Sequence, residues 1–130
     1  MLRLFNIHLD HISEKARVDG MHCVLDKMAE YSARLPMKTV ILGDFNAEPQ
    51  SLSVNMCSAH GAPALIDVTA AVERTYHDFG ELLASPPSKI DYIFVSTELA
   101  SAHVKTEVWA DEHHGIYLSD HYPVLAEFEY

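Results

Sequence analysis

The sequence predicts one domain of the α+β class, in which strands and a single long helix pack in layers. Three observations support this: short runs with the apolar pattern of strands, one stretch with helical periodicity, and irregular polar loops between them. The 130 residues have the length of one domain and suffice for a hydrophobic core. Hydrophobic residues make up 48% of the chain, which is typical of a globular protein.

The first two predicted elements are a strand over 2–9 and a long helix over 13–35. Alternation in the strand places Leu2, Leu4, Asn6 and His8 on one face and Arg3, Phe5, Ile7 and Leu9 on the other. Ser13 is the expected N-cap of the helix, and Pro36 ends it. The helical spacing predicts a buried stripe made of Val18, Met21, Leu25, Met28 and Leu35.

The rest of the chain predicts shorter elements. Residues 39–42 form a short apolar run that suits a buried strand, and 51–59 hold one helical turn, whereas 65–72 are ambiguous. Three further strands are expected at 90–96, 103–109 and 124–130. We expect the strands to form one mostly antiparallel sheet, with the long helix packed on one face.

Charge and composition limit the partners. Nineteen acidic residues against nine basic ones give a net charge of −10, and no basic patch is evident. This argues against tight, non-specific binding of nucleic acid, although a carboxylate-rich metal site is itself acidic. No apolar run reaches the roughly 20 residues of a membrane helix, and no signal peptide is evident, so localisation is left open. Cys23 and Cys57 lack zinc-binding spacing and are expected to be buried free thiols.

The polar residues that could carry chemistry lie at the margins of the predicted strands. They are Asn6, His8 and Asp10 on the first strand, Asp44 and Asn46 after the second, Asp91 at the start of another, and Asp120 and His121 before the last. Each has a simple structural explanation when taken alone, because Gly-Asp-x-Asn often forms a turn and a lone histidine often lies in a core. Carboxylates beside apolar runs are costly unless paired or metal-bound, so their joint occurrence predicts one shared site.

Four segments resemble the endonuclease/exonuclease/phosphatase superfamily, which includes deoxyribonuclease I, and they occur in the order found there. They are Asn6-Ile7-His8-Leu9-Asp10-His11, Gly43-Asp44-Phe45-Asn46-Ala47-Glu48-Pro49, Ile90-Asp91-Tyr92-Ile93-Phe94 and Ser119-Asp120-His121-Tyr122-Pro123-Val124. A fifth segment, Thr75-Tyr76-His77-Asp78-Phe79, is similar to a loop of the family. The resemblance implies half of a two-layer β-sandwich with flanking helices, which makes four α/β/β/α layers when complete.

The resemblance also implies roles for individual residues in phosphoester hydrolysis. His8 would hydrogen-bond the scissile phosphate, Asn46 would hold phosphate or water, and Asn6 and His77 would bind substrate. Asp44 would contact metal or orient the attacking water, and Asp120 would lie in the metal site. Asp91 would orient His121, the general base or phosphate-stabilising donor. The implied cofactor is Mg²⁺ or Mn²⁺, because both ions prefer oxygen ligands.

Residues 1–130 are expected to form a single partial domain that lacks the first half of this fold. In the family that half supplies an asparagine and the principal metal-binding glutamate, so we expect the chain alone to have little activity. We also expect an uncovered sheet face, and a homodimer in which a second copy covers it. The acidic charge slightly favours a small phosphoester over nucleic acid as the substrate.

Two other functions fit parts of the sequence. One is a non-catalytic remnant or interaction module that keeps the fold without turnover. The other is a metallo-β-lactamase-type hydrolase, whose His-x-His-x-Asp-His signature nearly matches residues 6–11. Asn6 stands where that signature requires a zinc-binding histidine, and that fold does not explain the Gly-Asp-Phe-Asn or Ser-Asp-His segments.

Overall fold

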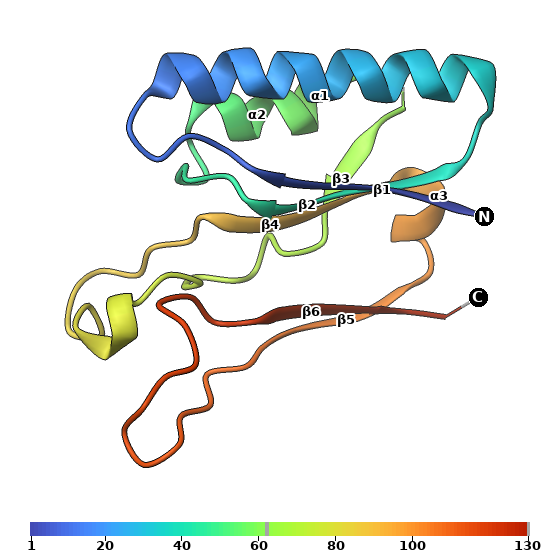
Figure 1. Cartoon of the computed structure of the whole chain (residues 1–130). Helices are drawn as coiled ribbons and strands as arrows, with labels where there is room; N and C mark the ends of the chain where they lie inside the picture. The colour runs from blue at the N-terminus through green and yellow to red at the C-terminus, as the bar shows by residue number, and fades with distance from the viewer. Residues whose placement is uncertain (62, 130) are drawn as a thin grey trace.

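The computed structural model describes residues 1–61 and 63–129, which form three layers (Figure 1). Helices α1 (Glu14–Arg34) and α2 (Leu52–Ala59) lie on one face of a four-stranded sheet. A two-stranded sheet lies on the other side of that sheet. This arrangement confirms the predicted α+β class. None of the helices in the described part of the chain has the length and apolar character needed to cross a lipid bilayer.

The first strand and the long helix follow the predicted pattern closely. Strand β1 (Leu2–His8) alternates between exposed and half-buried positions, as its sequence predicts. Helix α1 begins after Ser13, whose side chain accepts a hydrogen bond from the backbone N–H of Ala16. The helix buries Met21, Leu25 and Met28, whereas Leu35 is the C-cap and is 55% exposed. The prediction that Leu35 belongs to the buried stripe is therefore wrong, because the helix ends before it.

The remaining elements are mostly short. Strand β2 (Lys38–Asp44) is longer than the apolar run suggested, so Asp44 is its last residue and does not follow it. The remaining strands are β3 (Leu65–Asp67), β4 (Asp91–Ser96), β5 (His103–Val108) and β6 (Val124–Phe128). A 3₁₀ turn, η1 (Asp78–Gly80), and a one-turn helix, α3 (Thr97–Ala100), complete the described elements.

The strands form two sheets, so the prediction of a single sheet is wrong. The larger sheet has the order β1-β2-β4-β3, in which β1 and β2 are parallel and the other two pairings are antiparallel. Strands β5 and β6 form a separate antiparallel pair, and within residues 1–61 and 63–129 they pair with no other strand. Thr106 of β5 nevertheless donates a side-chain hydrogen bond to the carbonyl of Val68, which ties the small sheet to the large one.

Two hydrophobic cores hold the layers together. The larger core lies between the helices and the four-stranded sheet, where Met21 and Met28 of α1 meet Ile41 and Phe94 of the sheet. The smaller core lies between the two sheets and centres on Val40, Val95 and Leu99, with Phe128 of β6 packed against it. Cys57 is buried in the larger core, but Cys23 is exposed on α1, so only one of the two predicted buried thiols is buried.

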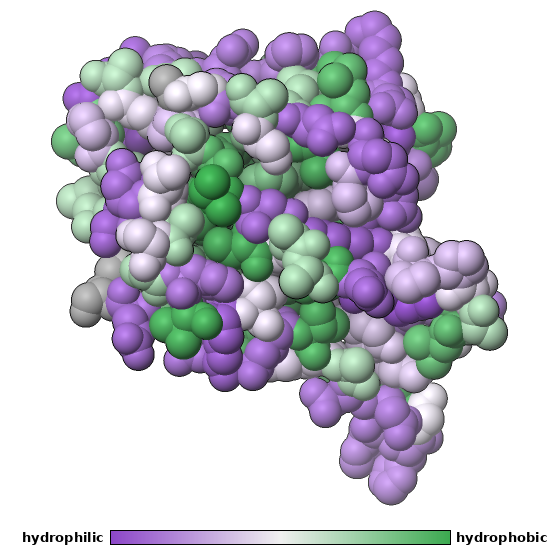
Figure 2. Space-filling view, turned by 180° about the vertical axis from the view of Figure 1, so that it is seen from behind, coloured by the Kyte–Doolittle hydropathy of each residue, from purple (hydrophilic) through white to green (hydrophobic). Residues whose placement is uncertain are grey.

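Strand β1 is an edge strand, and the face of it turned away from α1 is open. Leu2 and Leu4 lie on that face and are 44% and 54% exposed. On the face of the molecule shown in Figure 2, hydrophobic residues lie in groups among hydrophilic ones. The prediction of an uncovered sheet face is therefore wrong for the part over β2 and β4, where the small sheet packs, and only the edge strand β1 keeps exposed leucines.

Candidate active site

The site is built where three strand ends meet at one end of the four-stranded sheet. The parallel strands β1 and β2 end side by side at His8 and Asp44, which are register partners. Strand β4 runs antiparallel to β2 and begins at Asp91, the register partner of Asp44. Side chains at directly paired positions lie on the same face of a sheet. The topology therefore brings His8, Asp44 and Asp91 together on one face, although they are far apart in sequence.

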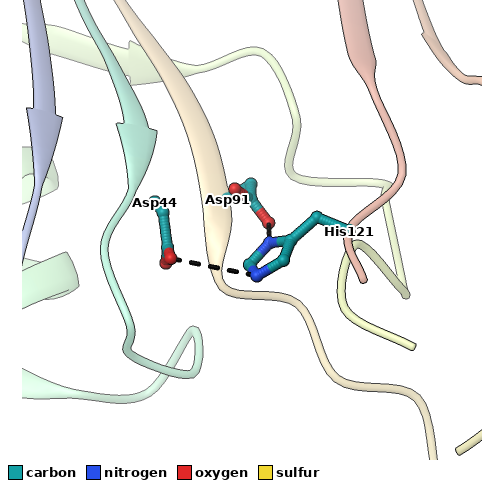
Figure 3. Close-up of side chains that lie close together, drawn as sticks. All are labelled: Asp44, Asp91 and His121. Carbon is teal, nitrogen blue, oxygen red and sulfur yellow. Dashed lines mark hydrogen bonds and ion pairs between the residues drawn. The ribbon is translucent and has the colours of Figure 1, made fainter. Parts of the chain in front are cut away.

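His121 reaches this cluster from the loop before β6 (Figure 3). Its Nδ1 lies 2.8 Å from Oδ2 of Asp91, within hydrogen-bond distance, and its Nε2 lies 3.9 Å from Oδ2 of Asp44. The Nε2 of His8 lies 3.4 Å from the same Asp44 oxygen. The expected contact between Asp91 and His121 is thus present in the structure.

Asp44 and Asn46 are fixed by a tight turn that begins where β2 ends. The backbone N–H of Asn46 donates to Oδ1 of Asp44 at 2.7 Å, and its side-chain amide donates to Oδ2 at 3.2 Å. The same amide donates to the carbonyl of Leu9 at 2.9 Å. Asn46 has a φ of 49°, a conformation that asparagine tolerates better than most residues. The Gly-Asp-Phe-Asn segment therefore forms the turn that its sequence predicts, and this turn fixes the carboxylate of Asp44 beside His121.

Burial and neighbouring charges shift two pKa values in the cluster. The pKa of His121 is raised above its ordinary value, mainly by the hydrogen bond to Asp91 and further by the charges of Asp91, Asp44 and Asp120. The pKa of Asp44 is raised as well, first by burial and then by repulsion from Asp91. Both shifts favour the protonated form, so the cluster tends to hold a proton on His121 or on Asp44.

The loop from 75 to 78 supports the cluster from the side of the small sheet. The ring of Tyr76 meets the ring of His121 edge-on, with centroids 5.0 Å apart. Thr75 is fully buried, and its hydroxyl accepts hydrogen bonds from the backbone N–H groups of Ile90 and Asp91. Sequence reasoning noted this loop as family-like but assigned no role to Thr75 or Tyr76, because hydroxyl and aromatic residues in a polar segment carry no distinctive spacing.

Three residues predicted for the site lie apart from the central group. Among the described residues, Asp44, Asp91 and His121 form the one group of three acidic or imidazole side chains that all lie within 4.8 Å of one another, so Asp120 is not a member. The Asp120 carboxylate accepts a hydrogen bond from Ser119, and its carbonyl accepts one from the backbone of His77. Asn6 is exposed on β1, on the same face as His8.

His77 is fully buried and packs as an aromatic ring. It stacks on Tyr122 with centroids 3.9 Å apart, and its Nδ1 accepts a hydrogen bond from the backbone of Gly80. Its Nε2 is buried and has no hydrogen-bond partner among the residues that the structure describes. This placement keeps the ring away from solvent, so the structure does not support the prediction that His77 contacts substrate.

The cluster has the parts of a hydrolytic acid–base centre. A carboxylate that accepts from one imidazole nitrogen fixes the tautomer and leaves the other nitrogen available to take a proton. The carboxylates of Asp44 and Asp91 are hard oxygen ligands that suit Mg²⁺ or Mn²⁺, and their separation fits one shared ion. The arrangement is therefore chemically suited to acid–base work beside an oxygen-bound divalent ion.

Comparison with known proteins gives the family. Residues 5–125 match the family model described as endonuclease-reverse transcriptase. The chain belongs to the endonuclease/exonuclease/phosphatase superfamily, as its four segments predicted. None of the curated proteins matches the chain.

Solved structures agree with this assignment. An endonuclease/exonuclease/phosphatase from Bacteroides vulgatus is 32% identical with a TM-score of 0.77, over 94% of this chain and 48% of that one. The mannosyl-6-phosphatase Bt3783 of Bacteroides thetaiotaomicron is 27% identical with a TM-score of 0.75, over 98% and 51%. The 3′ phosphatase NExo from Neisseria, bound to a product DNA hairpin, shares the fold at 22% identity and a TM-score of 0.71, over 98% and 61%. The chain spans about half the length of the first two.

Proposed function

We propose that this chain carries the acid–base centre of a divalent-metal-dependent phosphoester hydrolase, which acts by in-line attack of water on phosphorus. The observation that carries the proposal is the pairing of His121 with Asp91 at 2.8 Å, with the second imidazole nitrogen directed towards Asp44. Membership of a superfamily whose solved relatives include phosphatases supports it.

In this proposal His121 handles the proton. The Nδ1–H of its imidazole donates to Asp91, which holds the ring in one orientation and leaves Nε2 free to accept a proton from the attacking water. Asp44 then orients that water, because its Oδ2 lies between His121 and His8. The raised pKa of His121 makes it a stronger base than a free histidine and a suitable donor once it is protonated.

The phosphate is held by residues that line the open face of β1. The side chain of His8 is 74% exposed, so it is accessible to a phosphate oxygen. Asn6 lies two residues earlier on the same face and is placed to extend that contact along the substrate. Asn46 acts through Asp44, because the two N–H groups of its amide donate to the carbonyl of Leu9 and to Asp44, and its amide oxygen is left to accept from a bound water.

Asp44 is the proposed protein ligand of Mg²⁺ or Mn²⁺, and Asp91 is near enough to Asp44 to assist. Asp120, which lies outside this group, would contribute through a water bound to the ion. The ion, when bound, would neutralise charge on the phosphoryl oxygens and acidify water. Mg²⁺ keeps several waters and uses few protein ligands, so each carboxylate counts heavily. Since the chain spans about half the length of its relatives, we propose that a further carboxylate from outside residues 1–130 completes the site.

The net charge and the exposed leucines of β1 bear on the substrate and partner of the chain. The net charge of −10 favours a small phosphoester over nucleic acid, because a nucleic-acid substrate is itself highly negative. The exposed Leu2 and Leu4 at the first end of edge strand β1 favour a second copy of the chain as the cover of that end, which leaves Asn6 and His8 open to the phosphate.

A substrate panel tests the proposal. Hydrolysis of a sugar phosphate, an inositol phosphate, a phosphodiester and a DNA oligonucleotide should be compared with Mg²⁺, with Mn²⁺ and with a chelator. We expect phosphate release that needs the ion and is faster for the small substrates. If Mn²⁺ binds in a calorimetric titration but no substrate is cleaved by this chain or by a longer version, the non-catalytic interaction module is the better assignment.

A further inference from the structure

Thr75 lies at the junction between the two parts of the chain that carry Asp91 and His121. Its side chain is fully buried, and its backbone N–H donates to the carbonyl of Ser88 at 2.9 Å. Its own carbonyl accepts a hydrogen bond from the backbone N–H of Tyr122 at 2.7 Å. The backbone of this one residue therefore joins the segment just before β4 to the segment just before β6.

The hydroxyl of Thr75 adds a second connection on the side of β4. It accepts hydrogen bonds from the backbone N–H of Ile90 at 3.0 Å and of Asp91 at 3.1 Å. The side chain thus takes the place of a strand partner at the point where β4 begins. Buried N–H groups without an acceptor are costly, so these two bonds fix where the strand starts.

We propose that Thr75 is a positioning residue that sets the distance between Asp91 and His121. Its hydroxyl holds the backbone of Asp91, and its carbonyl holds the residue next to His121, so one rigid, buried group fixes both partners of the 2.8 Å contact. Residues 121 and 91 are not neighbours on a sheet ladder, and β5–β6 pairs with neither β2 nor β4. The consequence for catalysis rests on the proposed function, whereas the geometric part does not.

The test replaces the hydroxyl while keeping the shape of the side chain. Thr75→Val removes the acceptor, and Thr75→Ser keeps it. Thr39→Val is the matched control, because Thr39 is equally buried and its hydroxyl bonds to the carbonyl of Met37 near the start of β2. The first readout is the hydrogen-bonded Nδ1–H of His121 in ¹⁵N-labelled protein, which needs no substrate.

We expect that N–H signal to disappear by exchange with water in Thr75→Val and to persist in Thr75→Ser and Thr39→Val. In protein that hydrolyses a phosphodiester, Thr75→Val should lower kcat roughly 10- to 100-fold at nearly constant KM, because misplacement by about 1 Å can cost 100-fold. A persistent signal in Thr75→Val, or equal loss in Thr39→Val, overturns the proposal. If Thr75→Val does not fold, loss of the signal in folded Thr75→Ser overturns it instead. Absence of turnover in the parent, with the signal behaving as expected, would count against the proposed function alone.

Discussion

His121 depends on Asp91 for its protonation behaviour. The hydrogen bond to Asp91 is the largest cause of the raised pKa of His121, and burial opposes it. Asp91→Asn should therefore lower the pKa of His121, as measured by an NMR titration of its ring carbon resonances without metal. Asp19→Asn, which removes an exposed carboxylate on α1, should leave the titration of His121 unchanged. An unchanged pKa in Asp91→Asn would show that the contact does not form in solution.

The hydrogen bond between Asp91 and His121 also makes the stability of the fold depend on pH. A histidine whose folded pKa is raised contributes stability that is fully present below its unfolded pKa of about 6.5, and loses it as the pH rises through the raised value. The stability difference between the parent and Asp91→Asn should accordingly be larger at pH 6 than at pH values above the folded pKa of His121.

Some of these residues could be found from the sequence and others could not. Asp44, Asp91 and His121 stand beside apolar strands, where an unpaired polar group is costly, so their pattern carries a signal. His77 carries no such signal, because a histidine stacked on Tyr122 looks the same in sequence as one that faces substrate. Cys23 follows Met21 by two positions, and that spacing on a helix points it away from the buried stripe.

At the scale of single elements, the two N-caps provide a matched comparison. The hydroxyl of Ser13 accepts from the backbone N–H of Ala16 at the start of α1, whereas Ser51 at the start of α2 makes no side-chain cap bond. Ser13→Ala should lower the free energy of unfolding by about 1 kcal/mol, within a range of roughly 0.5–2. Ser51→Ala should change it much less. Chemical denaturation measures both, and equal effects would contradict the assigned cap.

The presence of most helices and strands could be predicted from local sequence patterns. The length of each strand, however, depends on the neighbouring strands that pair with it. The alternation of β1 and the stripe of α1 are local properties, and both were predicted apart from Leu35, which lies beyond the end of the helix. Strand β2 extends to Asp44 because β1 and β4 pair with it to that residue. Strand β3 has only three residues, and its assignment rests on pairing with β4. Non-local hydrogen bonds of this kind leave no trace in a short run of sequence.

At the scale of the molecule, the separate β5–β6 sheet was not foreseen. The residues of β5 and β6 alternate like those of any strand. This pattern does not indicate whether the two strands pair with β4 or pack across the larger sheet. The contacts of Val95 and Phe128 show that packing across the sheet prevails. That choice covers the β4 side of the sheet and leaves the face of β1 open.

The open face predicts self-association. If a second copy covers Leu2 and Leu4, light scattering at micromolar concentration should give the mass of a dimer. Leu4→Glu should give a monomer, because it places a charge in the interface, and Leu118→Glu should remain a dimer, because Leu118 is 90% exposed in a distant loop. A monodisperse monomer in the parent would contradict the proposed cover.

The central claim is that the cluster of Asp44, Asp91 and His121 carries phosphoester hydrolysis. The most direct test is the rate of hydrolysis of one chromogenic phosphodiester with Mn²⁺, measured for a longer version of the protein that carries the additional carboxylate. His121→Ala in that protein should lower the rate by roughly two to four orders of magnitude, the usual worth of a positioned acid–base group. His22→Ala, which alters an exposed histidine of α1, should leave it unchanged, and residues 1–130 alone should turn over slowly. Equal rates in the parent, in His121→Ala and in residues 1–130 alone would contradict the account.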